Sequence, residues 1–247
     1  MRRASEKVIV VAGGTGNVGG FIVRALLERG HSVAVPSRSA ESLADLQAYL
    51  ASHLGPEHLR GLHTFTGTIS SEIEGPEIAE EIAETLGKPQ SVVALMGRWH
   101  GVDSLQEATQ ADLDYVLEHY LKAHFGVAQA FLPHLQEGGT YMSVNGPLAF
   151  DVWPGSALVS IATAGQHMLF KALASEYDEH PTSVCELVSH AYIRDRTTQP
   201  GSPLPGQAVG AFVAHLLLDG RARLHGESVH LRSMEQLDEL GISVAEA

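Results

Sequence analysis

Three glycines recur at intervals of three residues near the N-terminus of this 247-residue chain, at Gly13, Gly16 and Gly19. They follow a short apolar run, Lys7 to Ala12, and precede a segment with apolar residues at helical spacing. In such a turn the first glycine permits a tight bend, the second lets the backbone approach a pyrophosphate, and the third lets helix and strand pack closely. Unpaired N–H groups at the helix start attract the phosphates. We therefore predict a dinucleotide site formed by Gly13, Thr15, Gly16, Asn17, Val18 and Gly19.

The residues after the second predicted strand indicate which dinucleotide binds. A protein that prefers NAD usually has a carboxylate here, which accepts a hydrogen bond from the ribose 2′-hydroxyl. This chain has Pro36-Ser37-Arg38-Ser39 instead, and no carboxylate follows before Glu41. Arg38 can pair with a 2′-phosphate and Ser37 can donate a hydrogen bond to it. The pattern predicts NADP(H) as the cofactor.

Strand and helix patterns alternate along the whole chain. Short β-branched, apolar runs predict strands buried on both faces, and segments with apolar residues three and four apart predict helices. The predicted strands are 7–12, 32–35, 62–66, 91–97, 140–144, 183–188 and 227–231. The predicted helices are 17–29, 41–54, 76–86, 113–135, 156–177 and 207–218. This order implies a single Rossmann-like α/β domain over residues 1–247, a doubly wound parallel sheet with helices on both faces.

Composition and charge narrow the classes of partner. The chain has 29 acidic and 16 basic residues, a formal net charge of -13, and we expect neither nucleic acid nor a membrane surface as a partner. No segment reaches the roughly 18 consecutive apolar residues of a membrane span. Cys185 is the only cysteine, which favours a reducing compartment. We expect a cytoplasmic protein that acts on a small molecule.

Two further chemistries are disfavoured. The fourteen histidines include pairs five residues apart, such as His119 and His124, which do not share the helical face that a zinc pair needs. The sequence contains no His-Glu-x-x-His motif, no cysteine pair and no Gly-x-Ser-x-Gly elbow. We therefore expect no metal site and no serine hydrolase.

Together these features resemble the short-chain dehydrogenase/reductase family over nearly the whole chain. The resemblance is carried by the glycine turn, by Ser37-Arg38, by the long helix before strand 139–144, and by Lys171-Ala172-Leu173-Ala174-Ser175-Glu176. That last segment is like the Ala-Leu-Ala-x-Glu end of the family's active-site helix. The family implies a nicotinamide-dependent oxidoreductase that forms a homodimer or homotetramer. Small-residue helix faces within 123–130 and 157–174 fit helix pairing between subunits.

Carried over residue by residue, the resemblance implies further cofactor contacts. The stretch after the family's fourth strand appears here as Ala94-Leu95-Met96-Gly97, which assigns Met96 and Gly97 to the cofactor. Thr68 and Ile69 follow the third strand, where an acidic residue of the family often holds adenine. Thr163 could hydrogen-bond the nicotinamide ribose.

The family's catalytic residues are missing at the positions to which the resemblance assigns them. The Tyr falls on Val159, the Lys on Thr163 and the Ser on Gly146, and this region contains no Tyr-x-x-x-Lys. The Asn of the preceding long helix falls on Tyr120, or on His119 in a shifted register. Reduction of a ketone creates an alkoxide, which needs a hydrogen-bond donor and a proton. A proton donor of a different kind must therefore act if the chain is a reductase.

Three hypotheses stay open, of which we favour the first. In the first, the chain is an NADPH-dependent ketone or quinone reductase in which Asn145 polarises the carbonyl and Tyr120, His190 or Tyr192 relays the proton. In the second, it is a catalytically inactive NADP(H)-binding sensor or scaffold. In the third, the same fold catalyses an isomerisation or elimination. The residues expected at the pocket mouth suit a small aromatic or polycyclic substrate: Trp99, His100, Tyr120, Trp153, His190 and Tyr192.

Residues 194–206 are rich in Pro, Gly, Thr and Ser and follow the sixth predicted strand at the ligand edge of the sheet. A long loop in this position is typical of a lid. Its Arg194 and Arg196 could reach the cofactor phosphates or an acidic substrate. We predict that this loop is a substrate lid.

Overall fold

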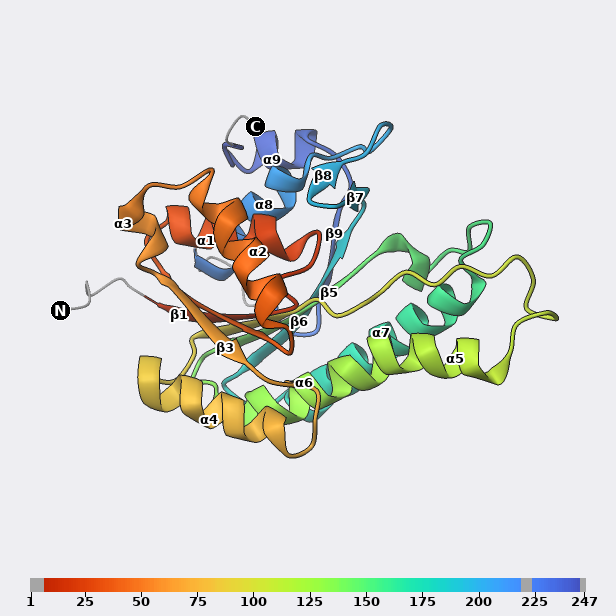
Figure 1. Cartoon of the computed structure of the whole chain (residues 1–247), viewed down its shortest axis with the longest axis horizontal. Coiled ribbons are helices and arrows are strands. Elements are labelled where there is room, and N and C mark those ends of the chain that lie inside the picture. The colour runs from red at the N-terminus through yellow and green to blue at the C-terminus, as the bar shows by residue number, and fades with distance from the viewer. Residues whose placement is uncertain (1–6, 219–223, 245–247) are drawn as a thin grey trace.

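The computed structural model describes residues 7–218 and 224–244. Its centre is a parallel seven-stranded sheet with the strand order β3-β2-β1-β4-β5-β6-β9 (Figure 1). The strands are β1 (Val8–Ala12), β2 (Ser32–Ser37), β3 (Leu62–Thr66), β4 (Ser91–Ala94), β5 (Thr140–Asn145), β6 (Ser183–Ser189) and β9 (Ser228–Leu231). The predicted α/β class with a doubly wound parallel sheet is confirmed.

Helices cover both faces of the sheet (Figure 1). One face carries α1 (Gly19–Glu28), α2 (Ala40–Ala51), the short α3 (Pro56–Leu59), α8 (Gly206–Leu218) and α9 (Glu235–Glu239). The other face carries α4 (Glu74–Leu86), α5 (Gln110–Leu117), α6 (Ala123–Phe131) and α7 (Ala157–Glu176). This arrangement buries each central strand on both sides.

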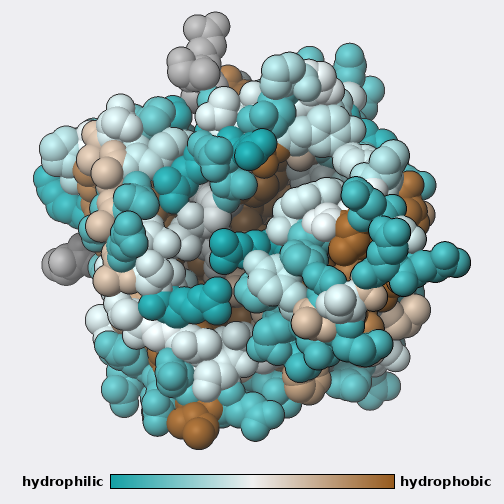
Figure 2. Space-filling view, turned by 45° about the vertical axis from the view of Figure 1, so that its right-hand side comes forward, coloured by the Kyte–Doolittle hydropathy of each residue, from teal (hydrophilic) through white to brown (hydrophobic). Residues whose placement is uncertain are grey.

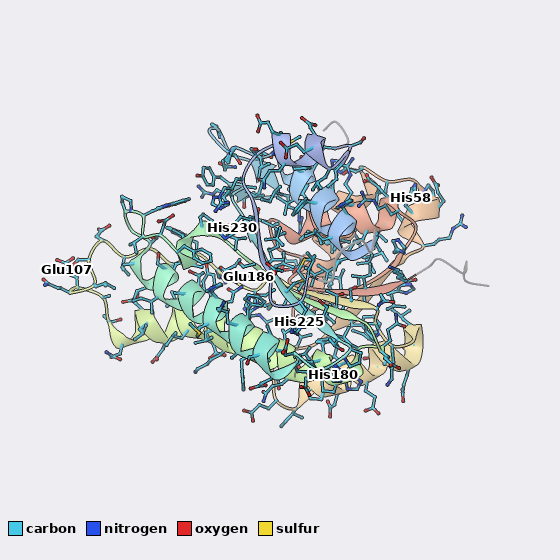
Figure 3. All side chains as sticks on the ribbon, turned by 180° about the vertical axis from the view of Figure 1, so that it is seen from behind. His58, Glu107, His180, Glu186, His225 and His230 are labelled. Carbon is cyan, nitrogen blue, oxygen red and sulfur yellow. The ribbon has the colours of Figure 1, made fainter. Side chains whose placement is uncertain are left out.

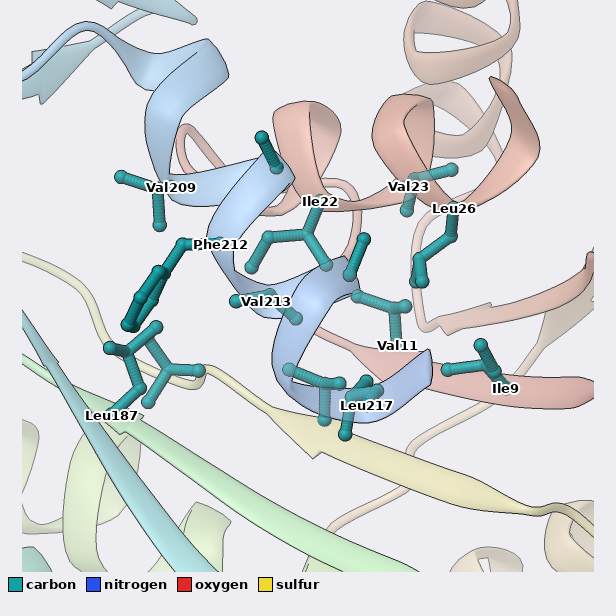
Figure 4. Packing of buried hydrophobic residues seen from close by; sticks show 14 of the residues in the cluster. Ile9, Val11, Ile22, Val23, Leu26, Leu187, Val209, Phe212, Val213 and Leu217 are labelled. Carbon is teal, nitrogen blue, oxygen red and sulfur yellow. The ribbon is translucent and has the colours of Figure 1, made fainter. Parts of the chain in front are cut away.

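The core follows from the alternation of side chains along a strand. In β1, Ile9 and Val11 point into the cluster under α1 and α8, whereas Val8, Val10 and Ala12 point into the cluster under α4 and α6. Figure 4 shows Phe212 and Val213 of α8 in the first cluster. A strand with both faces covered must be apolar at every position, and this is the pattern of β1 in the sequence.

The long helix predicted over 113–135 is composite. A capping box starts α5, because the Thr109 side chain accepts from the Asp112 backbone N–H while the Asp112 carboxylate accepts from that of Thr109. A π-helical turn, Glu118–Lys122, then separates α5 from α6, and a 3-10 turn, Leu132–His134, ends the run. Such π-turns occur often at functional sites.

The predicted loop 194–206 also has structure of its own. It contains a two-stranded hairpin formed by β7 (Ile193–Arg194) and β8 (Thr197–Thr198). The sequence did not predict the short helices α3 and α9 or a 3-10 turn at Pro147–Ala149. Each of these elements is too short to produce a periodic pattern of apolar residues. No helix among residues 7–218 and 224–244 is long and apolar enough to cross a membrane.

Candidate functional site

A cleft opens at the carboxyl ends of the central strands, and it consists of two adjoining cavities of about 250 and about 340 Å³. Both cavities are lined by Gly13, Gly16, Leu95, Met96 and Gly97, so they form one continuous site. We call the smaller cavity, which contains Arg38, the arginine half, and the larger one, which contains two tryptophans, the aromatic half. Figure 2 shows a hollow on this side of the molecule with apolar residues at its floor.

The cleft lies where the strand order predicts it. After β1 the chain continues to β2, the neighbour of β1 on one side. After β4, the neighbour of β1 on the other side, it continues outward to β5, so the loops after β1 and β4 diverge. Open α/β sheets bind ligands in the crevice that such a reversal creates. Residues that follow β1, β2, β3, β4 and β5 therefore meet at one edge although they are far apart in the sequence.

The glycine turn between β1 and α1 has the geometry of an anion cradle. Gly13 has a φ of 89°, and a side chain there would overlap the carbonyl oxygen of Leu95. A side chain at Gly19 would overlap the carbonyl oxygen of Gly13. Within the described chain, the backbone N–H groups of Asn17, Val18 and Gly19 donate to no protein acceptor. Free N–H groups at a helix N-terminus bind phosphate well, so these residues fit a dinucleotide.

All six residues predicted at this turn border the cleft. Thr15 lines the arginine half, Asn17, Val18 and Gly19 line the aromatic half, and Gly13 and Gly16 line both.

The arginine half also contains the four residues predicted after β2 and β3: Ser37, Arg38, Thr68 and Ile69. Strands β2 and β3 pair in register, with Ser37 beside Thr66, which brings the two following loops together. No carboxylate within residues 7–218 or 224–244 forms an ion pair with Arg38. Its guanidinium is therefore available to an anionic group in this half of the cleft.

A buried histidine supports the loop after β4. The Nε2 atom of His124 lies 3.1 Å from the backbone nitrogen of Met96 and 3.2 Å from its carbonyl oxygen. Burial lowers the pKa of His124 to about 4, although the bond to Met96 opposes this shift. His124 is thus neutral at physiological pH, and it fixes Met96 and Gly97 between the two halves. Sequence reasoning missed this role, because a histidine on an apolar helix face carries no signal for a contact 28 residues away.

Tyr120 lies in the π-helical turn and lines the aromatic half, as predicted. Its ring packs directly on Gly97, where an added Cβ would lie 2.5 Å from the ring. Burial raises the pKa of Tyr120 to about 12, and Tyr115 contributes in the same direction. The Tyr120 hydroxyl has no hydrogen-bond partner in the part of the chain that the structure describes. Tyr120 is therefore protonated at physiological pH, and it lines the aromatic half.

Asn145 also lines the aromatic half, but its side-chain amide faces inward. Its Nδ2 donates to the carbonyl oxygen of Thr163 at 3.1 Å and to Oε1 of Glu186 at 3.2 Å, and its Oδ1 accepts from the N–H of Gly146 at 2.9 Å. An amide has two N–H donors, and both are engaged. The arrangement therefore corrects the hypothesis that Asn145 polarises a substrate carbonyl, because no N–H remains for that bond.

The partner of Asn145 is a fully buried carboxylate that sequence reasoning also missed. Oε2 of Glu186 lies 2.7 Å from Nδ1 of His167 and accepts a bond of 2.6 Å from the Ser228 hydroxyl. Figure 3 shows Glu186 below His230 in the interior of the molecule. An unpaired buried charge is costly, whereas a paired and hydrogen-bonded one is tolerated. Glu186 thus connects β5, α7 and β9 behind the wall of the aromatic half.

Two of the positions discussed on α7 lie in the wall beside Asn145. Val159 and Thr163 both line the aromatic half and are buried. The Thr163 hydroxyl donates to the Val159 carbonyl oxygen at 2.8 Å, along its own helix. Hydroxyls that bond backward in this way are common inside helices. Thr163 therefore lines the cleft while its hydroxyl proton is engaged by a carbonyl oxygen of its own helix.

The segment after β6 brings Tyr192 to the cleft but not His190. Ser189, Ala191 and Tyr192 line the aromatic half, and the Tyr192 ring meets Trp153 edge-on at 5.5 Å. His190 lines neither half, and its Nε2 lies 3.5 Å from Nδ1 of His230. The His190 N–H also donates to the carbonyl oxygen of Leu231, so both its backbone and its ring contact β9. The expectation that His190 reaches a substrate is therefore corrected.

The two halves of the cleft differ in charge. Charged or titratable side chains line the arginine half: Arg38, Arg98, Glu118 and His119. The described lining of the aromatic half has no Asp, Glu, Lys, Arg or His. Its side chains include Trp99, Tyr120, Trp153 and Tyr192 beside small and aliphatic residues. One end of the cleft thus suits phosphates, and the other suits an uncharged, planar group.

The family now follows from a direct comparison. A family profile described as short chain dehydrogenase matches residues 7–192. The chain belongs to the short-chain dehydrogenase family. It is an α/β protein of an oxidoreductase family, with the glycine turn, the π-turn and α7 all within the matched region.

Individual relatives are distant. The NADPH-dependent pterin aldehyde reductase of Arabidopsis thaliana is 28% identical over 129 residues, which cover 52% of this chain and 51% of the relative. The match thus spans about half the length of that protein.

Solved structures share the fold. A short chain dehydrogenase of Burkholderia cenocepacia J2315 in complex with NADP has a TM-score of 0.75 and 21% identity, covering 92% of this chain and 96% of that one. A short chain oxidoreductase of Pseudomonas aeruginosa PAO1, described as containing an atypical catalytic center, has a TM-score of 0.78 and 22% identity, covering 94% and 98%. Their resemblance to this chain is one of fold.

The neutral state of His124 predicts a pH dependence of stability. Its folded pKa of about 4 lies below the ordinary 6.5, so protons bind the unfolded chain more readily. Its contribution is fully present above pH 6.5 and decreases by roughly 3 kcal/mol as the pH falls toward 4. When the pH is lowered from 6.5 to 4, the free energy of unfolding measured in urea should decrease less for His124→Gln than for the wild type. The exposed His53→Gln is the control, and an equal loss in all three proteins would contradict this role of His124.

Proposed function

We propose that the cleft binds NADP(H), with the 2′-phosphate at Ser37 and Arg38, the pyrophosphate at the glycine turn, and the nicotinamide in the aromatic half. The free N–H groups of Asn17, Val18 and Gly19 support the pyrophosphate position. The unpaired Arg38 supports the preference for the phosphorylated nucleotide. The pterin aldehyde reductase to which the chain is similar uses NADPH, and the Burkholderia structure holds NADP.

Substitution of Arg38 tests the choice of nucleotide. Hydrogen bonds to charged groups contribute about 1.5–3 kcal/mol, so Arg38→Ala should raise the Kd of NADPH by about 10- to 100-fold. The Kd of NADH should stay within about twofold. Arg60→Ala, an exposed arginine outside the cleft, is the control. If calorimetry finds equal affinities for NADPH and NADH in the wild type and in Arg38→Ala, the proposal is wrong.

The reaction that we propose is reduction of a small, uncharged aromatic carbonyl compound or quinone by NADPH. The observation that carries this proposal is the aromatic half, with four aromatic side chains and no charged one in its described lining. Away from the N–H groups of the glycine turn, this lining offers a charged substrate no ionic partner to replace its hydration, which favours an uncharged one. Aromatic side chains instead stack against flat, neutral rings.

The proton donor in this proposal is not the family's usual one. Val159, Thr163 and Gly146 occupy the positions that the resemblance assigns to the catalytic Tyr, Lys and Ser. The Pseudomonas relative in fold, with its atypical catalytic center, is a precedent for a member that departs from the standard set.

Tyr120 is the donor that the geometry favours. NADPH supplies the hydride when it is bound. The carbonyl oxygen then gains negative charge and needs a hydrogen-bond donor, and Tyr120, which lines the aromatic half, carries a hydroxyl without a partner in the described chain. An alkoxide is more basic than a phenolate, so transfer of the Tyr120 proton is favourable even with a pKa of about 12. Tyr192, more exposed beside Trp153, is a second hydroxyl that can connect the cavity with solvent.

A panel of aromatic ketones and quinones tests this mechanism through NADPH consumption. Tyr120→Phe should lower kcat by about 10²- to 10⁴-fold, the usual contribution of a positioned acid. Tyr115→Phe, one helical turn earlier and outside the cleft lining, should change kcat by less than about threefold. Because Tyr120 is deprotonated only near pH 12, the wild-type rate should show no loss of a tyrosine proton between about pH 6 and 10. Full activity of Tyr120→Phe would exclude Tyr120 as the donor.

The same panel distinguishes a reductase from a non-catalytic protein. Tight NADPH binding without turnover of any member would favour the second hypothesis, an NADP(H)-binding sensor or scaffold. The Asn145 amide and the Thr163 hydroxyl support this alternative, because both donate their hydrogen bonds within the protein and leave none for a substrate.

We also propose that the chain forms a homodimer or homotetramer through α6 and α7. Phe125 on α6 and Ile161 and Met168 on α7 are large apolar side chains exposed on the outer layer. Light scattering should give a mass of at least twice the 26.4 kDa of one chain. Met168→Glu should shift the population toward monomer, whereas Leu240→Glu, at an exposed site on another part of the surface, should not. A mass of one chain for the wild type would contradict this proposal.

A further inference from the structure

Arg196 makes an unusual connection between the hairpin after β6 and the glycine turn. It sits at the tip of the β7–β8 hairpin, where Asp195 and Arg196 have φ values of 49° and 53°. Residues other than glycine adopt this left-handed backbone only at a cost in free energy. They are the only non-glycine residues with positive φ in the described chain. Something in the native structure must therefore hold them there.

The side chain of Arg196 supplies that support. Its Nη2 donates to the carbonyl oxygen of Thr15 at 2.8 Å, across 181 residues of sequence. Its guanidinium carbon lies 5.4 Å from the centre of the Tyr49 ring on α2, within the range of a cation–π contact. At Gly20, on α1, an added Cβ would lie 3.0 Å from Cδ of Arg196. The arginine thus lies in a groove formed by the glycine turn, α1 and α2.

Arg196 itself does not border the cleft, whereas the residue that it holds does. Thr15 lines the arginine half, and Arg196 reaches the Thr15 carbonyl from outside both cavities. The position therefore corrects the expectation that Arg196 reaches the cofactor phosphates directly. Its positive charge lies behind the turn, where it adds to the field that favours an anion at the N–H groups of that turn.

The other end of the hairpin borders the aromatic half. Tyr192 and Ile193 line that half, and Tyr192 is hydrogen-bonded within the same loop. Its carbonyl oxygen accepts from Gln199 N–H at 2.8 Å, and its N–H donates to the Ser202 hydroxyl at 2.9 Å. The hairpin is thus a small, internally bonded unit with Arg196 on the glycine turn and Tyr192 at the substrate end.

We infer that Arg196 is a positioning residue that couples occupation of the glycine turn by NADP(H) to the placement of Tyr192 and Ile193 over the substrate end. This inference rests on the proposed function. When the pyrophosphate restrains the glycine turn, it also restrains the Thr15 carbonyl oxygen. The hydrogen bond from Arg196 to that oxygen then restrains the hairpin. Occupation of the turn therefore favours the placement of the hairpin that completes the aromatic half, and a substrate held by the hairpin should in turn tighten the binding of NADP(H).

The test compares hairpin variants by hydrogen exchange and by NADPH binding. Arg196→Ala removes the contacts with Thr15 and Tyr49. Arg194→Ala is a matched control because that side chain, on the same hairpin, is 79% exposed. A double variant, Asp195→Asn with Arg196→Gly, keeps the turn, since Asn-Gly suits two left-handed positions, but lacks the guanidinium. Readouts are amide exchange of peptides covering residues 192–199, with and without NADPH, and the NADPH dissociation rate by stopped flow.

In the wild type and in Arg194→Ala, NADPH should slow exchange of the hairpin. In Arg196→Ala and in the double variant that protection should be lost, and NADPH should dissociate roughly tenfold faster. Loss of protection in the double variant, which keeps the turn, would show that the guanidinium of Arg196 is required and that a folded turn alone is not enough. If NADPH binds and protects the hairpin equally in all four proteins, this inference is wrong although the proposed cofactor is right. If the wild type does not bind NADPH, the proposed function fails, and this inference fails with it.

Discussion

The contact on which the site depends is backbone against backbone, where Gly13 after β1 lies on Leu95 after β4. No side chain fits between them, because a Cβ at Gly13 would overlap the Leu95 carbonyl oxygen. This close approach occurs where the order of the sheet reverses, so the two loops diverge immediately afterwards and leave the cleft. The neighbouring contacts follow the same rule of close approach. Gly19 packs on Gly13, Gly97 receives the ring of Tyr120, and Gly20 admits Arg196.

The two halves of the cleft differ in the polarity of their lining because different elements form them. The arginine half is formed by loops after β2 and β3, where exposed polar residues are easily accommodated. The aromatic half lies between α7, the π-turn and the loops after β5 and β6, and its described lining is uncharged. NADP(H) has a related division, with the 2′-phosphate at the adenosine end, the pyrophosphate in the middle and the uncharged amide-bearing nicotinamide ring of NADPH at the other end. The fold therefore explains why one continuous groove suits both parts of such a ligand.

Behind the aromatic half, hydrogen bonds within the protein engage the polar side chains that line the wall. Asn145 bonds Thr163 and Glu186, Gln166 donates to the Val144 carbonyl oxygen, and Thr163 bonds its own helix. The buried Glu186 is tolerated because three side chains donate to it or pair with it. Such a network makes the wall rigid and leaves little hydrogen-bonding capacity for a substrate. Tyr120 and Tyr192 line the same half and take no part in this network.

The sequence by itself determined the features that rest on local chemistry. The apolar strands, the glycine spacing and the pair Ser37-Arg38 act through their own backbone and near neighbours, so the α/β class and the residues of the cleft around the turn could be predicted from them. Only the tertiary structure decided what depends on partners far along the chain. Asn145 loses its free N–H groups to Thr163 and Glu186, and His190 turns toward His230 because of the register of β6 and β9. His124 and Arg196 gain their roles from contacts 28 and 181 residues away. A side chain's type fixes which bonds it can form, but the packing of distant elements fixes which of those bonds are left for a ligand.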